Sequence, residues 1–192
     1  MDRTSWQDFD QLRGAAIGAL RGTVLELGAG SGANFEELAP GVRWIGLEPS
    51  VSARRELRRN ATGHGHTEPP LAAGGENIPL EDGSVDAVFS TYVLCSVDDV
   101  DRVLREVRRV LKPGGTALFI DHVAAPPQTW RRRLQDLASP ITRRVSGCRW
   151  NRDVTAAVEA SGLETVRLDR RDVASGRLTL AVPCTIHEVV NP

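Results

Sequence analysis

The sequence has no long apolar segment and no excess of charge of either sign. Its 192 residues are 41% hydrophobic and 26% charged, and no apolar run approaches the roughly 20 residues that span a bilayer. A membrane protein is therefore not expected. Lysines and arginines number 24 against 25 aspartates and glutamates, so nucleic acid is not an expected partner either. Residues 1–8 lack the basic and apolar pattern of a secretory signal, which favours a cytoplasmic location.

Cysteine is scarce, and its spacing is not that of a cross-linked or zinc-binding chain. Cys95, Cys148 and Cys184 are odd in number and far apart, unlike the paired cysteines of zinc sites and disulfide frameworks. A chain of this length can bury roughly 70% of its unfolded surface without such cross-links. We therefore expect reduced thiols and no bound metal.

Predicted strands and helices alternate along a single domain of residues 1–192. Buried-strand patterns occupy residues 23–27, 42–47, 71–73, 85–89 and 116–120, and helical patterns occupy residues 8–20, 33–38, 51–59 and 99–111. A last helix at 152–160 precedes closing strands at 164–169 and 178–189. Strands joined by helices pair in parallel with right-handed crossovers. The pattern predicts an α/β fold: a Rossmann-like, doubly wound, mostly parallel sheet of seven strands with an antiparallel C-terminal strand.

Residues 126–150 depart from this alternation. They are rich in arginine, contain three prolines and include Trp130, and Trp150 closes the segment. We interpret the segment as a helical cap over a binding site. Its arginines are typical of a solvated helix face, and the alternative is that they attract an acidic ligand.

A glycine-rich turn follows the first buried strand. Gly28-Ala-Gly-Ser-Gly32 allows a tight bend and a close approach of the backbone to a ligand, with free N–H groups nearby. The turn also satisfies the dinucleotide pattern G-x-G-x-x-[GA], and Glu48 lies where a ribose-binding acid would lie in either class. The turn alone leaves NAD and S-adenosylmethionine (SAM) both open.

Two further features favour SAM. Glu26 lies inside an apolar strand, where an unpaired charge is costly unless a cation or a hydrogen-bond donor lies nearby. The ammonium group of SAM could meet that need, directly or through water. Gly75-Glu-Asn77 puts an acid and an amide before a strand with an embedded Asp86, a block that dinucleotide dehydrogenases lack. The single tyrosine and single lysine, Tyr92 and Lys112, do not form the Tyr-x-x-x-Lys pair of such enzymes.

The segments that carry these features resemble the ubiquinone-biosynthesis-like branch of class I SAM-dependent methyltransferases, over residues 23–120. They are Val24-Leu-Glu-Leu-Gly-Ala-Gly-Ser-Gly32, Gly46-Leu-Glu-Pro49, Ala73-Gly-Gly-Glu-Asn-Ile-Pro79, Asp82-Gly-Ser-Val-Asp86 and Glu106-Val-Arg-Arg-Val-Leu-Lys-Pro-Gly-Gly115. Other segments are similar to the methyltransferase-like alkyl thiol methyltransferases: Gly32-Ala-Asn-Phe35, Val93-Leu-Cys-Ser-Val97, Asp121-His-Val-Ala-Ala125 with Trp130, and Gly147-Cys148. Asp121 stands where that family has Glu.

The resemblance implies a cofactor site for SAM, with S-adenosylhomocysteine as its product. The residues implied are Glu26, Gly28, Ala29, Gly30, Gly32, Asn34, Glu48, Pro49, Gly75, Glu76, Asn77 and Thr91. The glycine turn would line the methionine portion of SAM, and Glu48 would accept from the ribose hydroxyls. Glu76 and Asn77 would lie by the adenine, and Thr91 beside the cofactor.

Methyl transfer from a sulfonium is an in-line displacement, so the protein must mainly align donor and acceptor and exclude water. A thiol acceptor needs only a modest electrostatic push, because its thiolate fraction near neutral pH is appreciable. His122 follows a predicted strand and is our candidate base or substrate orienter, and Asp121 would orient its imidazole. The alternatives are a structural histidine and a solvated aspartate.

Three further residues are candidates for the acceptor pocket. Cys95, Trp130 and Trp150 would line it, although a buried cysteine and the tryptophans of a cap can also be plain packing residues. We therefore expect a SAM-dependent methyltransferase of a small molecule, with a thiol as the preferred acceptor. O-, N- or C-methylation of a small natural product or quinone-like metabolite is the alternative. From another class, a non-catalytic SAM-binding protein remains open.

Overall fold

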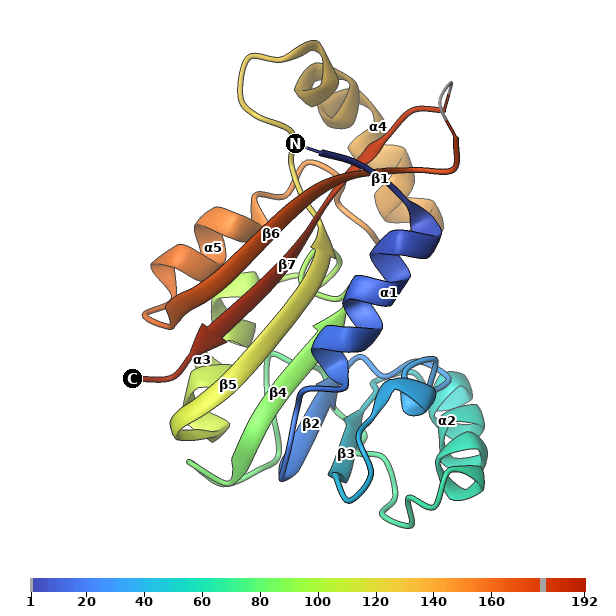
Figure 1. Cartoon of the computed structure of the whole chain (residues 1–192), viewed down its shortest axis with the longest axis vertical. Coiled ribbons are helices and arrows are strands. Elements are labelled where there is room, and N and C mark those ends of the chain that lie inside the picture. Colours follow the sequence, from blue (N-terminus) through green and yellow to red (C-terminus); the bar gives the residue numbers. More distant parts are fainter. Residues whose placement is uncertain (1, 177–178) are drawn as a thin grey trace.

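The computed structural model describes residues 2–176 and 179–192, and its centre is a seven-stranded sheet between helices (Figure 1). The strand order is β1-β6-β7-β5-β4-β2-β3. The strands are β1 (Asp2–Ser5), β2 (Thr23–Leu27), β3 (Arg43–Leu47), β4 (Val85–Thr91), β5 (Leu111–His122), β6 (Glu164–Ala174) and β7 (Val182–Val190). Only β7 is antiparallel, to both β5 and β6, among the strands described. The predicted Rossmann-like sheet with an antiparallel C-terminal strand is confirmed.

Two details of the predicted strands are wrong. Residues 71–73 form a single bridge, between Leu71 and Leu47, instead of a strand. The prolines at 69 and 70 cannot donate to a ladder, and two glycines follow at 74 and 75. The seventh strand is instead β1, which pairs in parallel with β6. The predicted closing strand began at residue 178, outside the described residues, and β7 begins at Val182.

Each α-helix described is preceded by a residue that suits the N-cap position. The helices are α1 (Trp6–Ile17), α2 (Val51–Gly63), α3 (Val100–Val110), α4 (Trp130–Ser146) and α5 (Val154–Ala160). The side chains of Ser5, Ser50, Asp99, Thr129 and Asp153 accept the N–H three residues onward. In the described ranges no helix has both the length and the apolar character needed to cross a bilayer.

The predicted helix at 33–38 is also shorter than expected. Only the single 3-10 turn η1 (Phe35–Glu37) forms there. The segment between Gly32 and Pro40 is too short for a stable α-helix. Ordering the first helical turn costs more free energy than the hydrogen bond of that single turn contributes. The side chain of Asn34, at the start of this turn, is bound elsewhere, as described below.

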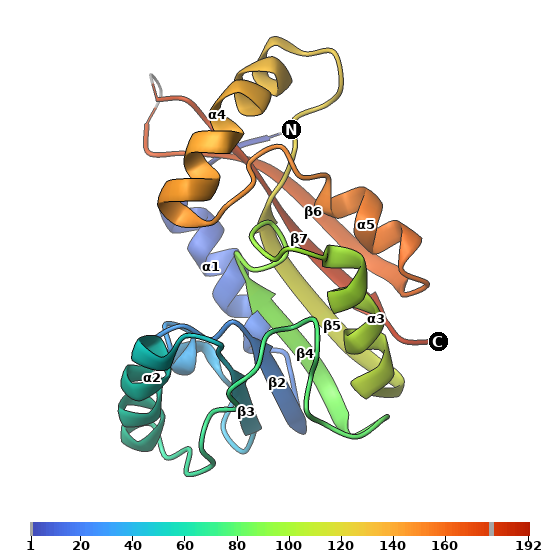
Figure 2. The ribbon, with the colours of Figure 1, turned by 180° about the vertical axis from the view of Figure 1, so that it is seen from behind.

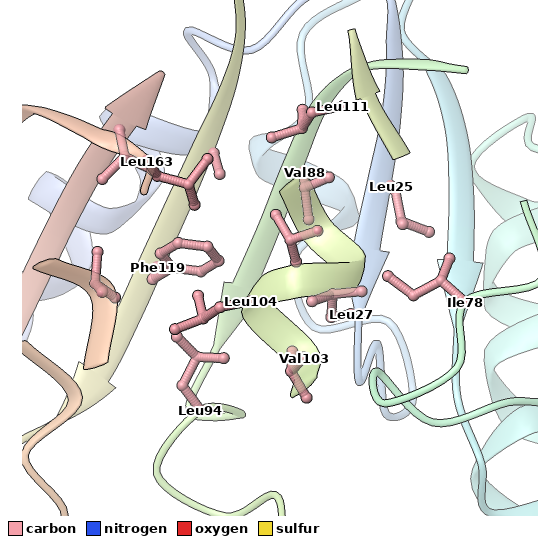
Figure 3. Packing of buried hydrophobic residues seen from close by; sticks show 14 of the residues in the cluster. Leu25, Leu27, Ile78, Val88, Leu94, Val103, Leu104, Leu111, Phe119 and Leu163 are labelled. Atoms are coloured by element: carbon pink, nitrogen blue, oxygen red, sulfur yellow. The ribbon is translucent and has the colours of Figure 1, made fainter. Parts of the chain in front are cut away.

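Two buried clusters cover the two faces of the sheet. One contains residues of α1 and α2, including Phe9 and Leu57. The other contains residues of α3 and α5, which lie on the face seen in Figure 2. Successive residues of a strand point to opposite faces, so Phe119 of β5 joins the second cluster and Leu118 the first. Figure 3 shows Leu104 of α3 beside Phe119 of β5.

The residues of α3 explain why it packs there. Val103, Leu104, Val107 and Val110 are buried, at the spacing of one helix face. Helix α4, which lies beyond the carboxyl end of β5 (Figure 1), differs from α3 because its apolar residues face solvent. Its apolar residues Trp130, Leu134, Leu137, Ile141 and Val145 are exposed.

Candidate cofactor and acceptor site

The predicted site residues gather at one edge of the sheet. The parallel strands β2, β4 and β5 are neighbours, and their carboxyl ends meet there. Gly28 follows β2, Thr91 ends β4 and His122 ends β5. In open α/β sheets ligands bind outside the carboxyl ends of the strands.

The glycine turn is packed on one side and open on the other. A Cβ atom at Gly32 would lie 2.1 Å from the ring of Phe35, so no side chain fits there. Gly30 has φ +55°, a conformation that glycine adopts readily, and a Cβ built on it would meet nothing within 4 Å. Its N–H donates to Oε2 of Glu48 at 3.0 Å. The turn is therefore fixed in place and presents an open backbone at Gly30.

Glu26 has hydrogen-bond donors beside it, one of the two kinds of partner that we expected from the sequence. Its two carboxyl oxygens accept from Nδ2 of Asn34 at 2.6 Å and from Nε1 of Trp44 at 2.8 Å. Burial raises the pKa of Glu26 to about 7, against the lowering effect of these two donors. Neutral donors thus meet the need for which we invoked the cofactor's ammonium group, although each oxygen keeps a further lone pair.

Asn34 is the centre of a small polar network. Its Nδ2 also donates to Oγ1 of Thr91 at 3.1 Å, and its Oδ1 accepts from the guanidinium of Arg13. This network joins the ends of β2 and β4 to helix α1. Arg13 and Trp44 were not predicted, because neither stands in a recognisable motif and both reach the site across at least 18 residues of chain.

Glu48 lies at the end of β3 and is buried. Besides the Gly30 N–H, its carboxylate accepts the N–H of Ser50 at 2.7 Å. Two oxygens with two acceptor positions each leave room for further donors. Pro49, predicted beside it, follows directly in the chain, and the Pro49 carbonyl accepts from Arg54 at 2.8 Å.

Residues 75–77 pack against helix α3 and the residues just before it. A Cβ at Gly75 would meet Val103 at 3.1 Å, and Oε1 of Glu76 accepts the N–H of Asp98 at 3.3 Å. Arg102 donates to the Glu76 carbonyl at 2.7 Å. Asn77 is exposed.

His122 is half-buried, and aromatic rings surround it. Its ring stacks on Tyr92 with centroids 4.7 Å apart and meets the edge of Trp6 at 6.5 Å. Tyr92 has φ +59°, a strained conformation for a bulky residue, and its N–H donates to the carbonyl of Ile120 at 2.7 Å. Burial raises the pKa of Tyr92 above its ordinary value. Such strain places the Tyr92 ring against the imidazole.

Asp121 does not orient that imidazole. Its Oδ1 accepts the N–H of Cys95 at 3.1 Å, while its Oδ2 has no hydrogen-bond partner within the described ranges. Complete burial raises the pKa of Asp121 to about 7. The expected contact fails because neighbouring residues of a strand point to opposite faces. Cys148 is the group that meets Nδ1 of His122, at 3.5 Å.

The fold brings together two cysteines that are 53 residues apart. The sulfurs of Cys95 and Cys148 lie 3.3 Å apart, and both residues are buried. The hydrogen bond between them, and then the contact with His122, lower the pKa of Cys148 to about 5. The same bond and burial raise the pKa of Cys95. The sequence predicted Cys95 at the site but not its partner, because the spacing of the two cysteines carries no signal.

The two predicted tryptophans line different cavities near the start of β7. Trp130 is 65% exposed and borders a cavity of about 530 Å³ with Asp172. Trp150 is half-buried and borders a small cavity of about 30 Å³ with Pro183. Arg131 borders both. A groove of about 520 Å³ lies at the opposite, amino edge of the sheet and contains no predicted site residue.

Comparison with known proteins agrees with this geometry. A family model described as a methyltransferase domain matches residues 25–119. The chain is 35% identical over 167 residues to thiol S-methyltransferase TMT1B of Homo sapiens, which covers 85% of this chain and 68% of that protein. It is 38% identical over 150 residues to human thiol S-methyltransferase TMT1A, covering 76% of this chain and 62% of that one. The chain thus spans about two thirds of the length of these relatives.

A solved structure shares the fold at low sequence identity. Geranyl diphosphate C-methyltransferase from Streptomyces coelicolor A3(2), solved with Mg²⁺, geranyl diphosphate and S-adenosyl-L-homocysteine, superimposes with a TM-score of 0.72 at 14% identity. The match covers 97% of this chain and 82% of that one.

Proposed function

The chain belongs to the family of class I SAM-dependent methyltransferases that includes the thiol S-methyltransferases, and from this premise we propose that it methylates the sulfur of a small-molecule thiol. The observation that carries the choice of acceptor is the 35% identity to a thiol S-methyltransferase over 85% of the chain. A match of that extent must include residues 48–148, and therefore Glu48 and Thr91 at the cofactor edge and His122 on the acceptor side.

The residues at the carboxyl edge fit SAM. The open backbone at Gly30 leaves space that a Cβ would fill, and the carboxylate of Glu48 beside it keeps acceptor positions that suit a ligand with hydroxyls. When bound, SAM supplies an activated methyl group on a positively charged sulfur. We propose that the predicted cofactor residues hold it, with Asn34 and Thr91 fixed by their mutual hydrogen bond.

His122 is proposed to hold the acceptor sulfur and to favour its deprotonated form. The imidazole lies one strand along the edge from Thr91, and the rings of Tyr92 and Trp6 pack against it. A thiolate is the strong nucleophile, and aligning it near the methyl donor is the main task left to the protein. Asp121 supports the acceptor side through Cys95, so its role is indirect.

Residues 126–150 are proposed to cap the acceptor side of this single domain. Helix α4 lies beyond the carboxyl end of β5, and Trp130 and Trp150 border cavities there. We also propose a cytoplasmic location, supported by three free cysteines, which a reducing compartment maintains. The balance of charges supports a small molecule over nucleic acid as the acceptor.

A panel of acceptors tests the proposal. The purified protein is incubated with SAM and with matched small thiols, alcohols and amines of similar size, and products are identified by mass spectrometry. We expect methyl thioethers and S-adenosylhomocysteine in equal amounts from the thiols. Methylation of alcohols or amines with no thiol product would overturn the choice of sulfur, and SAM binding without any product would indicate a non-catalytic protein.

A further inference from the structure

Three metal-ligating side chains meet at the acceptor side of the site. Cys95 lies in the loop after β4, His122 ends β5, and Cys148 lies between α4 and α5. Their sulfur and nitrogen atoms all lie within 4.8 Å of one another. Spacing along the chain gave no sign of this cluster, since its members come from three separate segments.

The kinds of ligand in the cluster select a class of metal. Thiolates are soft ligands that select Zn²⁺, and imidazole suits Zn²⁺ as well. Structural zinc sites have four protein ligands, whereas catalytic ones have three and keep a fourth position for water or substrate. A set of two cysteines and one histidine is among the known catalytic sets. Two thiolates would also balance the charge of the ion in a buried position.

We propose that Cys95, Cys148 and Nδ1 of His122 bind one Zn²⁺, whose fourth position receives the sulfur of the acceptor thiol. This inference rests on the proposed function and states how His122 carries out its part in it. It replaces the expectation, drawn from cysteine spacing, that the protein holds no metal.

The distances are close to those a tetrahedral ion requires. Zinc–sulfur bonds of about 2.3 Å put two sulfur ligands about 3.8 Å apart, and a sulfur and a nitrogen ligand about 3.6 Å apart. Nδ1 of His122 and the sulfur of Cys148 are 3.5 Å apart, and the two sulfurs are 3.3 Å apart. The sulfurs must therefore separate by about 0.5 Å, and Cys95 must approach the imidazole.

The backbone around the cluster is already fixed. The N–H of Arg149 donates to the carbonyl of Cys95 at 2.9 Å, which ties the two cysteine loops together. Asp121 accepts the Cys95 N–H, and the hydroxyl of Thr142 donates to the Cys148 carbonyl at 2.8 Å. Such outer contacts orient metal ligands. His122 is half-buried, so a ligand can reach the cluster from its side.

The proposed step transfers the methyl group from the sulfonium of SAM to a zinc-bound thiolate. The acceptor thiol displaces the zinc-bound water and releases its proton to solvent, which leaves a zinc-bound thiolate. The sulfur lone pair then forms the bond to the methyl carbon as the bond from that carbon to the sulfonium sulfur breaks. The products are a methyl thioether and S-adenosylhomocysteine, and a second water returns to the zinc ion.

Metal content and a spectroscopic probe test the site. The purified protein is stripped with a chelator, reloaded with Zn²⁺ or Co²⁺, and compared with Cys95→Ala, Cys148→Ala and the matched control Cys184→Ala, a buried cysteine outside the cluster. We expect one Zn²⁺ per chain and sulfur-to-cobalt charge-transfer absorption in the wild type and control. Each cluster variant should bind Zn²⁺ at least about a hundredfold more weakly.

Several outcomes would overturn the inference. These are a wild type that takes up no Zn²⁺ and shows no charge-transfer band, a Cys184→Ala loss as large as that of Cys148→Ala, or a native mass two daltons low that reveals a disulfide. The wild-type spectrum decides the matter even if a cluster variant fails to fold. Thiol methylation by metal-free protein would overturn the role of the zinc ion in the reaction and leave the proposed function intact. Zinc binding without methylation of any thiol would overturn the proposed function and leave the metal site intact.

Discussion

Among single residues, Glu26 has the most unusual environment. It is fully buried, two neutral donors satisfy its oxygens, and burial raises its pKa to about 7 from an ordinary value of 4.5. The folded state therefore prefers the protonated form more than the unfolded chain does. The stability linked to that proton is complete below pH 4.5 and is lost as the pH rises through 7.

Replacing Glu26 with Gln should remove this pH dependence. The free energy of unfolding of the wild type should fall between pH 5 and pH 8 by up to roughly 3 kcal/mol, the equivalent of the pKa shift. Glu26→Gln should show a smaller fall, because its side chain does not ionise. Urea denaturation of both proteins at both pH values measures the difference, in which other titrating groups cancel. An equal fall in the free energy of unfolding in both proteins would contradict the raised pKa of Glu26.

Gly30 and Gly41 form a matched pair for the cofactor site. Both have positive φ, and a Cβ on either would meet nothing within 4 Å, so alanine strains the backbone similarly at both positions. Only Gly30 belongs to the glycine turn that we propose binds the cofactor. Gly30→Ala should weaken S-adenosylhomocysteine binding about tenfold, or about 1.4 kcal/mol, and Gly41→Ala should leave it unchanged. Equal affinities in calorimetric titration would move the cofactor away from this turn.

A variant at His122 should distinguish cofactor binding from turnover. The side chain of His122 contacts Tyr92, Trp6 and Cys148, and among the described residues no contact joins it to the glycine turn. His122→Ala should therefore keep the wild-type affinity for S-adenosylhomocysteine and lower kcat/KM for a thiol by about a hundredfold or more. Steady-state kinetics beside a binding titration provide both numbers. Wild-type kinetics in the variant would return His122 to a purely structural role.

At the scale of elements, α3 and α4 make a direct contrast. Leu104 of α3 is 1% exposed, whereas Leu137 of α4 is 76% exposed. Leu104→Ala should cost about 2–5 kcal/mol of unfolding free energy, because it opens a cavity in the core. Leu137→Ala should change it by less than about 0.5 kcal/mol. Urea denaturation compares them, and a large loss in Leu137→Ala would mean that this helix face is covered in solution.

The sequence predicted those elements whose residues carry their own pattern. The buried strand β4 and the apolar face of α3 are examples, because side-chain alternation or helical spacing is local. Strand β1 was missed, since its residues Asp-Arg-Thr-Ser are polar and it forms only by pairing with β6 at the far end of the chain. Local sequence carries no record of such a long-range pairing.

The same distinction applies to the candidate site. The glycine turn and the two acids near it were predicted, because a motif marks them. The partners of those residues were not: Arg13 reaches Asn34 from α1, and Cys148 reaches Cys95 from beyond α4. These contacts depend on how helices pack over the sheet edge, which no local pattern specifies.

In the whole molecule, the sheet order explains why the site lies where it does. Neighbouring parallel strands β3, β2, β4 and β5 bring the glycine turn, Glu48, Thr91 and His122 to one edge. Helix α1 directly follows β1, the outermost strand on the side of the sheet opposite β3, and its Arg13 binds Asn34 beside the turn. Segments from both sides of the sheet therefore contribute to the same site.

The decisive measurement for the cofactor is a calorimetric titration of the purified protein with S-adenosylhomocysteine, beside an identical titration with NAD. We expect one binding site per chain for S-adenosylhomocysteine and no heat of binding for NAD. Affinity for NAD, with none for SAM or S-adenosylhomocysteine, would contradict this expectation.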